Sequence, residues 1–222
     1  MPKSAKTPAA PKYEWRKTEK DFYLAKAVPA ELEVPPMNYF VVDGAGSPAD
    51  EEFQALIGVL YTLSYTIRMM PKSGWTPPDY QEYTVFPLEG VWRMDTDAWQ
   101  GGELDKSKLQ YRLMIRQPWF VTPDVAARAK ESARKKLPAE LLDGASFETL
   151  ADGLSVQMLH VGPYDTEPET FAAMNEFMAA RGLSRTELVH REIYLSDPRR
   201  VVPEKNRTTL RFFNLNRKST NP

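Results

Sequence analysis

The chain has 222 residues, 42% of them hydrophobic and 11% aromatic, so it can bury one sizeable core and we expect one compact unit. Its 29 lysines and arginines against 30 aspartates and glutamates leave a net charge of −1, which gives no overall field to attract nucleic acid or an anionic membrane. The absence of cysteine excludes disulfides, thiolate nucleophiles and cysteine-bound zinc, and favours a cytoplasmic location.

The N-terminal segment, residues 1–12, consists largely of Pro, Ala and Lys and has no apolar run. Such a segment is neither a signal peptide nor a membrane span, so we expect a disordered leader followed by one domain over residues 13–222. No later window reaches the roughly 18 consecutive apolar residues of a transmembrane helix, which favours a soluble protein without a membrane partner.

The first repeated unit begins with a predicted strand at residues 38–42, followed by Asp43-Gly44-Ala45-Gly46 as a turn and a helix that opens at Pro48-Ala49-Asp50. Apolar residues of that helix recur at helical spacing and form one stripe: Phe53, Leu56, Ile57, Leu60, Leu63 and Ile67. Two further strands are predicted at residues 82–92 and 109–117.

A connecting helix is predicted over residues 122–137, with Thr122 as its N-cap and Pro138 as its stop. Residues 147–150 are expected to begin the strand that leads into a second unit. That unit has a strand at 156–161, a turn at Gly162-Pro163-Tyr164, a helix at 168–180 and two strands at 187–195 and 208–215.

An offset of 118 residues relates the two units, because Gly44 aligns with Gly162, Phe53 with Phe171, Leu56 with Met174 and Leu60 with Met178. We therefore predict an α+β fold, a tandem pseudo-twofold repeat of strand-helix-strand-strand units over about 38–118 and 146–216. A half of about 80 residues exposes an apolar face and a sheet edge, so the halves should pair around a central ligand groove.

The strand at 187–195 carries the strongest candidate site. Its alternation places Leu188, His190, Glu192 and Tyr194 on one face and Val189, Arg191, Ile193 and Leu195 on the other. A carboxylate held among aromatic rings can act as a general base or as the counter-charge of a cation. A solvated sheet face, with Glu192 as an ordinary surface residue, fits the alternation equally well.

Glu89 is the counterpart of Glu192 in the first half, next to Pro87, which marks a strand edge or a bulge. Two such carboxylates can flank a ligand, but a helix cap or a surface salt bridge is the slightly favoured interpretation. Aromatic residues gather in the same half: Trp75, Tyr80, Tyr83, Phe86, Trp92, Trp99, Trp119 and Phe120. Several belong to the core, whereas a loop residue such as Trp75 is more typical of a pocket wall.

Other motif searches are negative. His160 and His190 are far apart and neither pairs with a glutamate at helical spacing, so we predict no metal site. The sequence has no phosphate loop, dinucleotide fingerprint or nucleophile elbow, and we expect no cofactor. Arg199 and Arg200 belong to a predicted loop with solvated charges and can at most rim a pocket.

Several segments together resemble the stand-alone GyrI-like proteins, relatives of the gyrase-inhibitory protein and of the ligand-binding domains of multidrug-sensing regulators. These segments are Phe22-Tyr23, Val34-Pro35-Pro36, Tyr39-Phe40-Val41-Val42-Asp43-Gly44, Pro87-Leu88-Glu89-Gly90-Val91-Trp92, Gln117-Pro118, Arg191-Glu192-Ile193-Tyr194-Leu195-Ser196-Asp197-Pro198 and Pro203-Glu204-Lys205. The resemblance covers about residues 20–216. It implies two αβ repeats around a groove for lipophilic, often cationic compounds, with Glu192 matching the glutamate at the groove floor.

The leading hypothesis is a small-molecule binding module with Glu192 and Tyr194 at its centre and Glu89, Trp92, Trp75, Tyr83, Trp119 and His190 as further ligand contacts. Some stand-alone relatives are hydrolases that open the cyclopropane ring of DNA-alkylating natural products, which makes such a detoxifying hydrolase, with Glu192 as base and Tyr194 as hydrogen-bond donor, the alternative. A protein-interaction module of the gyrase-inhibitor kind is a third hypothesis. The sequence does not determine an oligomeric state.

Overall fold

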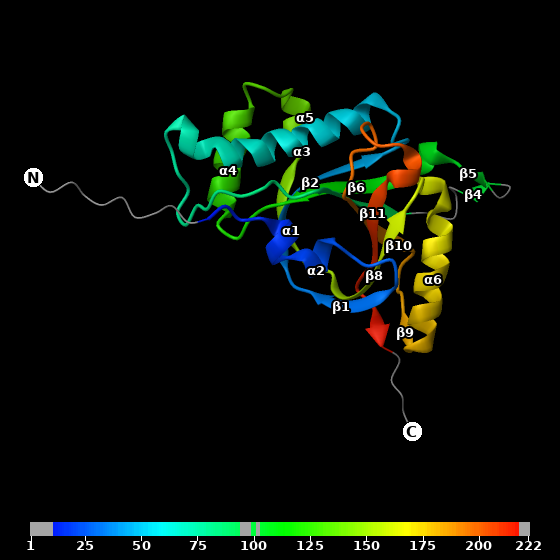
Figure 1. The fold of residues 1–222 in the computed structure, drawn as a ribbon. Coiled ribbons are helices and arrows are strands. Elements are labelled where there is room, and N and C mark those ends of the chain that lie inside the picture. The colour runs from blue at the N-terminus through cyan, green and yellow to red at the C-terminus, as the bar shows by residue number, and fades with distance from the viewer. Residues whose placement is uncertain (1–10, 94–98, 101–102, 218–222) are drawn as a thin grey trace, which may run out of the picture.

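The computed structural model describes residues 11–93, 99–100 and 103–217, and one curled antiparallel sheet organises it as a half-barrel (Figure 1). The eight strands lie in the order β1-β8-β11-β10-β3-β6-β2-β7. Their bounds are β1 Ala30–Val34, β2 Met37–Ala45, β3 Leu88–Arg93, β6 Gln110–Arg116, β7 Ser146–Leu150, β8 Gly153–Val161, β10 Val189–Tyr194 and β11 Arg207–Phe212. Two short ribbons pair β4 Trp99–Gln100 with β5 Glu103–Leu104, and β9 Leu183–Ser184 with β12 Asn216–Arg217.

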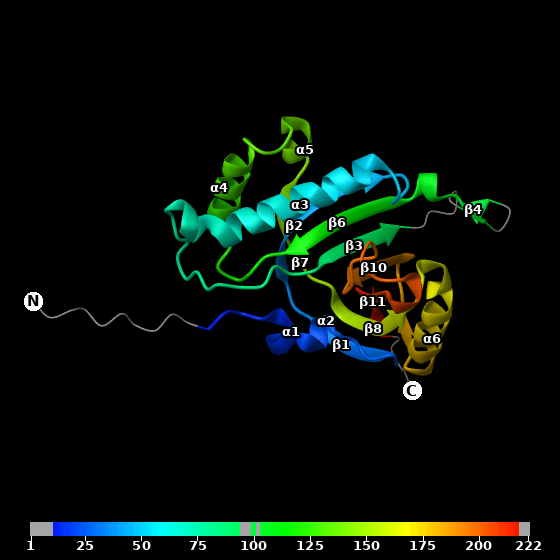
Figure 2. The same cartoon turned by 45° about the horizontal axis from the view of Figure 1, so that its top comes forward.

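Helices cover both faces of this sheet. The helices are α1 Trp15–Thr18, α2 Lys20–Tyr23, α3 Glu51–Met69, α4 Pro123–Ala133, α5 Ala139–Asp143 and α6 Glu167–Ala180, with short 3-10 turns η1 Met70–Ser73, η3 Lys106–Lys108, η4 Tyr164–Thr166 and η5 Pro203–Lys205. On one face α3 packs against β2 and β6, and α6 packs against β8 (Figure 2). On the other face α2 contacts the sheet, where the Tyr23 carbonyl accepts a hydrogen bond from Thr209.

The apolar stripes expected on the two long helices form the cores on the α3 and α6 side. Phe53, Leu56, Leu60 and Leu63 of α3 are buried in one cluster, and Met174 and Met178 of α6 are buried in another. Between the halves, Thr122 caps α4 as expected by accepting a hydrogen bond from the Val125 amide. None of the helices in the described ranges is long and apolar enough to cross a bilayer.

Both halves contain strand, helix, strand and strand in the same order: β2, α3, β3, β6 and β8, α6, β10, β11. In the sheet, the strands of each half lie together, with β8, β11 and β10 on one side and β3, β6 and β2 on the other, so that β10 and β3 meet at the centre. The first strands are exchanged, since β1 of the first half pairs with β8 while β7, which leads into the second half, pairs with β2. The residue-by-residue offset of 118 stays a prediction.

Several predicted boundaries differ from the structure; for example, the helix predicted at 122–137 ends at Ala133, and the strand predicted at 156–161 begins at Gly153. Gly44 lies within strand β2 and not in a turn, because it pairs with Tyr111, whose ring lies over it: a Cβ atom there would be 2.4 Å from that ring. The turn comes at Gly46, whose φ of +110° favours glycine. The strand expected at 82–92 begins only at Leu88, since Pro87 has no amide hydrogen to pair. The leader expected at 1–12 lies, for its first ten residues, outside the described part of the chain.

Candidate functional site

The two central strands bring distant residues onto one face. His190 pairs with Trp92 and Glu192 pairs with Gly90 across β10 and β3. Directly paired residues of antiparallel strands point to the same side, and the period of two adds Tyr194 to that side. Because the ring of Phe53 on α3 stacks on Trp92 and the ring of Phe171 on α6 contacts His190, this is the face that both long helices cover.

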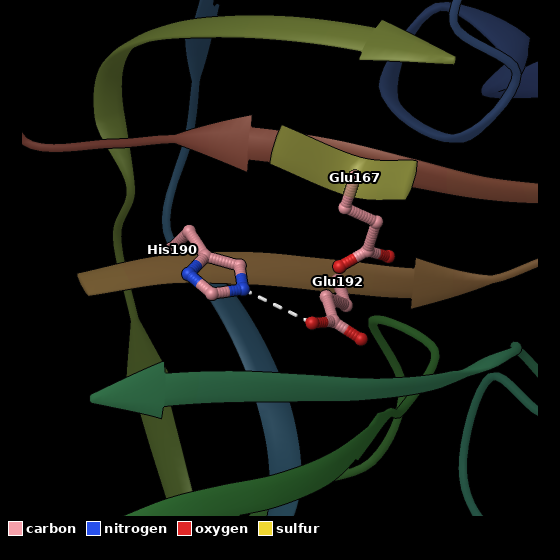
Figure 3. Close-up of side chains that lie close together, drawn as sticks. All are labelled: Glu167, His190 and Glu192. Atoms are coloured by element: carbon pink, nitrogen blue, oxygen red, sulfur yellow. Dashed lines mark hydrogen bonds and ion pairs between the residues drawn. The ribbon is translucent and has the colours of Figure 1, made fainter. Parts of the chain in front are cut away.

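A buried cluster of Glu167, His190 and Glu192 lies on this face (Figure 3). The imidazole Nε2 of His190 is 3.0 Å from Oε1 of Glu192, and a carboxyl oxygen of Glu167 completes a group whose atoms lie within 4.8 Å of one another. Only 7% of Glu192 is exposed, and the other two members are as deeply buried. The sequence left open whether Glu192 is held among aromatic rings or is an ordinary surface residue. The structure shows that it is buried.

The electrostatics of the cluster are dominated by negative charge in a dry environment. Burial, together with the carboxylates of Glu192 and Asp165, raises the pKa of Glu167 to about 9. One of its carboxyl oxygens, Oε1, is buried without a hydrogen-bond partner. Glu167 is therefore a protonated acid near neutral pH, within reach of a second carboxyl group.

Aromatic groups surround the cluster. The indole Nε1 of Trp92 donates a hydrogen bond of 2.9 Å to the hydroxyl of Tyr194. Burial, with the charge of Glu192, raises the pKa of Tyr194 well above its ordinary value, so this hydroxyl keeps its proton. Gly90 makes room for the pair, since a Cβ atom there would lie 2.9 Å from the indole nitrogen. Tyr164, 39% exposed, packs edge-on against Tyr194.

Glu89 lies on the opposite face of the sheet. It pairs with Ile193, and its carboxylate forms a buried ion pair of 2.9 Å with Arg191. Asp152 joins Arg191 at 2.6 Å and Arg211 at 3.0 Å, which makes a buried network of two acids and two guanidinium groups. Glu89 is thus half of a salt bridge, as the favoured interpretation held, but this salt bridge is buried and Glu89 does not face Glu192.

A cavity of about 810 Å³ borders this opposite face and is lined in part by Asp152, Arg191 and Phe213. Its rim carries Arg93, Arg112 and Glu187, and each of these charged side chains has an ion-pair partner. Arg191 in its wall is likewise paired with Glu89 and Asp152, and we do not place the candidate site there.

Three predicted aromatic contacts lie away from the cluster. Tyr83 is buried beneath α3, where its hydroxyl donates to the Ser64 carbonyl. Trp75 lies beneath the guanidinium of Arg128, which is 4.3 Å from its ring centre. Trp119 is 54% exposed and packs against Tyr13. Of the eight predicted site residues, the structure brings together Glu192, Tyr194, Trp92 and His190.

Sequence reasoning missed Glu167. It is the first residue of α6, and acidic residues are common in the first turn of any helix because they interact favourably with its dipole. Nothing in Asp165-Thr166-Glu167-Pro168 distinguishes a buried carboxyl group from a solvated one. The same donor types occur in metal sites, and Glu167, His190 and Glu192 each offer one ligand atom within 4.8 Å of the others, so the absence of a metal site stays a prediction.

Comparison with known proteins gives matches along most of the chain. A family model described as the GyrI-like small molecule binding domain matches residues 28–212. Two crystal structures from Listeria innocua, one described as a hydrolase and one as an uncharacterized conserved protein, are each 38% identical with a TM-score of 0.83, and cover 92% of this chain and 100% of their own. The EcmrR C-terminal domain has the same fold at 11% identity and a TM-score of 0.51, covering 85% of this chain and 97% of its own. No curated protein sequence matches the chain.

Proposed function

Because the chain belongs to the GyrI-like family of small-molecule binding domains, we propose that it binds its ligand between α3 and α6, against Glu192. The ligands proposed are flat, lipophilic and aromatic, with organic cations among them. One observation carries the proposal: the buried carboxylate of Glu192 lies on the same face as Trp92 and Tyr194. We keep the cytoplasmic location expected from the composition as part of this proposal.

The chemistry of these groups suits such ligands. Aromatic rings offer large apolar surfaces to a flat molecule, and their π faces attract cations. A carboxylate in a dry site interacts more strongly with a cation than it would in water. Glu192 would therefore provide the charge, while Trp92 and Tyr194 would provide contact area.

Access to Glu192 requires a local movement, since the carboxylate is buried in the unliganded chain. Tyr164 is the exposed aromatic residue next to Tyr194, and it lies on the short turn η4. A single turn is more easily displaced than a strand of the sheet. We propose that η4 moves when a ligand enters.

The test of this proposal is the binding of a permanently charged aromatic dye, N-methylacridinium, followed by its fluorescence. We expect micromolar affinity for the unaltered chain and at least a tenfold loss for Glu192→Gln, or about 1.4 kcal/mol. Glu176→Gln is the control, because Glu176 is exposed on α6. Equal affinity of Glu192→Gln and the unaltered chain would show that Glu192 is not the counter-charge.

A second candidate function is hydrolysis of a cyclopropane ring conjugated to a carbonyl group. The pairing of a protonated Glu167 with Glu192 favours it, because an acid and a base side by side can move protons in both directions. A related chain, 38% identical, is described as a hydrolase. Glu192 would take a proton from water, whose oxygen attacks a ring carbon. The carbon–carbon bond breaks, and its electron pair reaches the carbonyl oxygen as a phenolate or enolate, to which Tyr194 would donate a hydrogen bond.

This candidate is tested by incubating the chain with a cyclopropanoid alkylating compound and following the ring-opened, water-added product by mass spectrometry. We expect Glu192→Gln to reduce the rate by about 100-fold or more, in line with the contribution of a general base. A rate equal to that in buffer alone would eliminate hydrolysis and leave binding as the function.

A further inference from the structure

Two buried carboxyl groups lie close together in the site. Glu167 extends from the start of α6 and Glu192 from the middle of β10, and Figure 3 shows the Glu167 side chain extending toward Glu192, whose carboxylate bonds to His190. Both belong to the group of atoms that lie within 4.8 Å. The buried Oε1 of Glu167 has no hydrogen-bond partner, which leaves this carboxyl group able to accept a further ligand.

Among the described residues, the elements packed around Glu167 and Glu192 provide no lysine or arginine that forms an ion pair with either carboxyl group. On η4, Asp165 is negative and pairs at the surface with Lys106, while Tyr164 is neutral. On β8, both ring nitrogens of His160 are engaged, by Thr170 and by the Pro163 carbonyl. On β10, Tyr194 keeps its proton, and His190 bonds to Glu192.

Two carboxylates in such a dry site cannot both be ionised without a cation, because their mutual repulsion adds to the cost of removing each charge from water. A proton resolves this conflict in the unliganded chain, and the raised pKa of Glu167 supports that assignment. A bound cation would resolve it equally well.

We propose that the site exchanges a proton for an organic cation: Glu167 holds the proton in the unliganded chain and releases it to solvent when the cation binds between Glu167 and Glu192. The inference rests on the proposed function and adds Glu167 as the residue that selects charged over neutral ligands. A neutral ligand of the same shape leaves the proton in place.

This exchange has a measurable consequence for affinity. Because each bound cation displaces one proton, the affinity for the cation should rise about tenfold per pH unit between pH 6.5 and 8.5. The affinity for a neutral ring should stay flat. Replacing Glu167 by glutamine, which carries no releasable proton, should remove the slope while the cation still binds to Glu192.

The experiment is calorimetric titration of the EDTA-dialysed chain with N-methylacridinium in phosphate and in Tris, two buffers with different heats of protonation. The difference in heat gives the number of protons released. Acridine, uncharged over the upper part of this pH range, serves as the neutral probe. The variants are Glu167→Gln, His190→Gln, and Glu176→Gln as a control on the exposed side of α6.

We expect about one proton released per cation in the unaltered chain and in Glu176→Gln, and none in Glu167→Gln. Binding without proton release in the unaltered chain overturns the exchange and leaves the proposed function intact. Release that persists in Glu167→Gln but disappears in His190→Gln also overturns it, because the proton then comes from the imidazole. Failure of every chain to bind either probe contradicts the proposed function itself.

Discussion

Arg191 and Glu192 are neighbours in the sequence, but their side chains lie on opposite faces of β10 and in different chemical surroundings. Arg191 is neutralised by Glu89 and Asp152 on one face. Glu192 meets a histidine, a tyrosine and a protonated carboxyl group on the other. A strand buried on both faces can therefore carry a structural charge and a proposed ligand-binding charge on neighbouring residues.

Gly90 provides a test of the site geometry at the residue scale. In Gly90→Ala the added Cβ would lie 2.9 Å from the Trp92 indole nitrogen and 3.1 Å from the Tyr194 hydroxyl, so we expect their hydrogen bond to break. Overpacking of this kind costs about 1–3 kcal/mol. We expect dye binding to weaken at least tenfold, measured by fluorescence titration at a temperature where the variant is folded.

Gly58→Ala is the matched control, since Gly58 lies in α3 with no atom within 4 Å of the added Cβ. It should raise the stability by about 0.5–1 kcal/mol and leave binding unchanged. Equal binding by the two variants would mean that Trp92 and Tyr194 do not shape the ligand site.

Glu167 makes the stability of the unliganded chain depend on pH. In the folded chain its pKa is about 9, above the value of 4.5 in the unfolded chain. Its contribution to the free energy of unfolding is therefore fully present below pH 4.5 and is lost as the pH rises toward 9. Between these two pH values the free energy of unfolding falls by at most about 1.4 kcal/mol per pH unit. Glu167→Gln cannot ionise, and we expect it to gain at least about 2 kcal/mol over the unaltered chain between pH 5 and pH 8.

Urea denaturation at several pH values measures this difference, with Glu176→Gln again as the exposed control. If the free energy of unfolding varied with pH in the same way for Glu167→Gln and the unaltered chain, Glu167 would not be protonated in the folded chain.

At the scale of elements, the buried ion network connects β3, β10 and β11 to the loop between β7 and β8. Asp152 in this loop accepts hydrogen bonds from Arg191 and Arg211, and these charges lower its pKa despite its burial. Its contribution to stability is therefore present above its ordinary pKa of 3.8 and lost as pH falls below it. The network fixes the loop to the face of the sheet opposite the proposed ligand site.

Asp152→Ala should destabilise the chain by about 3–5 kcal/mol, because it leaves two buried guanidinium groups with too little negative charge. Asp43→Ala removes an exposed ion pair with Arg112 and should cost less than about 1 kcal/mol. Urea denaturation at pH 7 compares the two. A similar small loss for both would show that Asp152 is dispensable to the network.

At the scale of the whole molecule, the exchanged strands make each half depend on the other. β1 completes the sheet beside β8, and β7 completes it beside β2. The first long strand of each half, β2 or β8, therefore has one neighbour that comes from the other half. A single sheet therefore spans both halves, and the proposed ligand site lies where their central strands meet.

We expect fragments 1–118 and 119–222 to be unfolded when separate and to regain the circular dichroism of the intact chain when mixed. The expectation follows from the strand exchange and from the small core available to about 100 residues. A cooperative thermal transition in either fragment alone would contradict it.

The sequence by itself determined the order of the strands and long helix within each of the two units and which residues share a face, but not β1, α1, α2 and α5. Helical spacing identified the buried stripe of α3, and alternation placed His190, Glu192 and Tyr194 together. These periodicities are local properties of the backbone, so they can be read from a few neighbouring residues. Strand ends were less predictable, since the ring of Tyr111 decides that Gly44 stays extended.

Only the tertiary structure decided what each face contacts. The register between β3 and β10 placed Trp92 beside His190 and turned Glu89 to the opposite side. The packing of α6 brought Glu167 to Glu192 from 25 residues away. A local pattern gives the direction of a side chain relative to its own element, whereas its partner is set by strand register and helix packing, which depend on residues distant in the sequence.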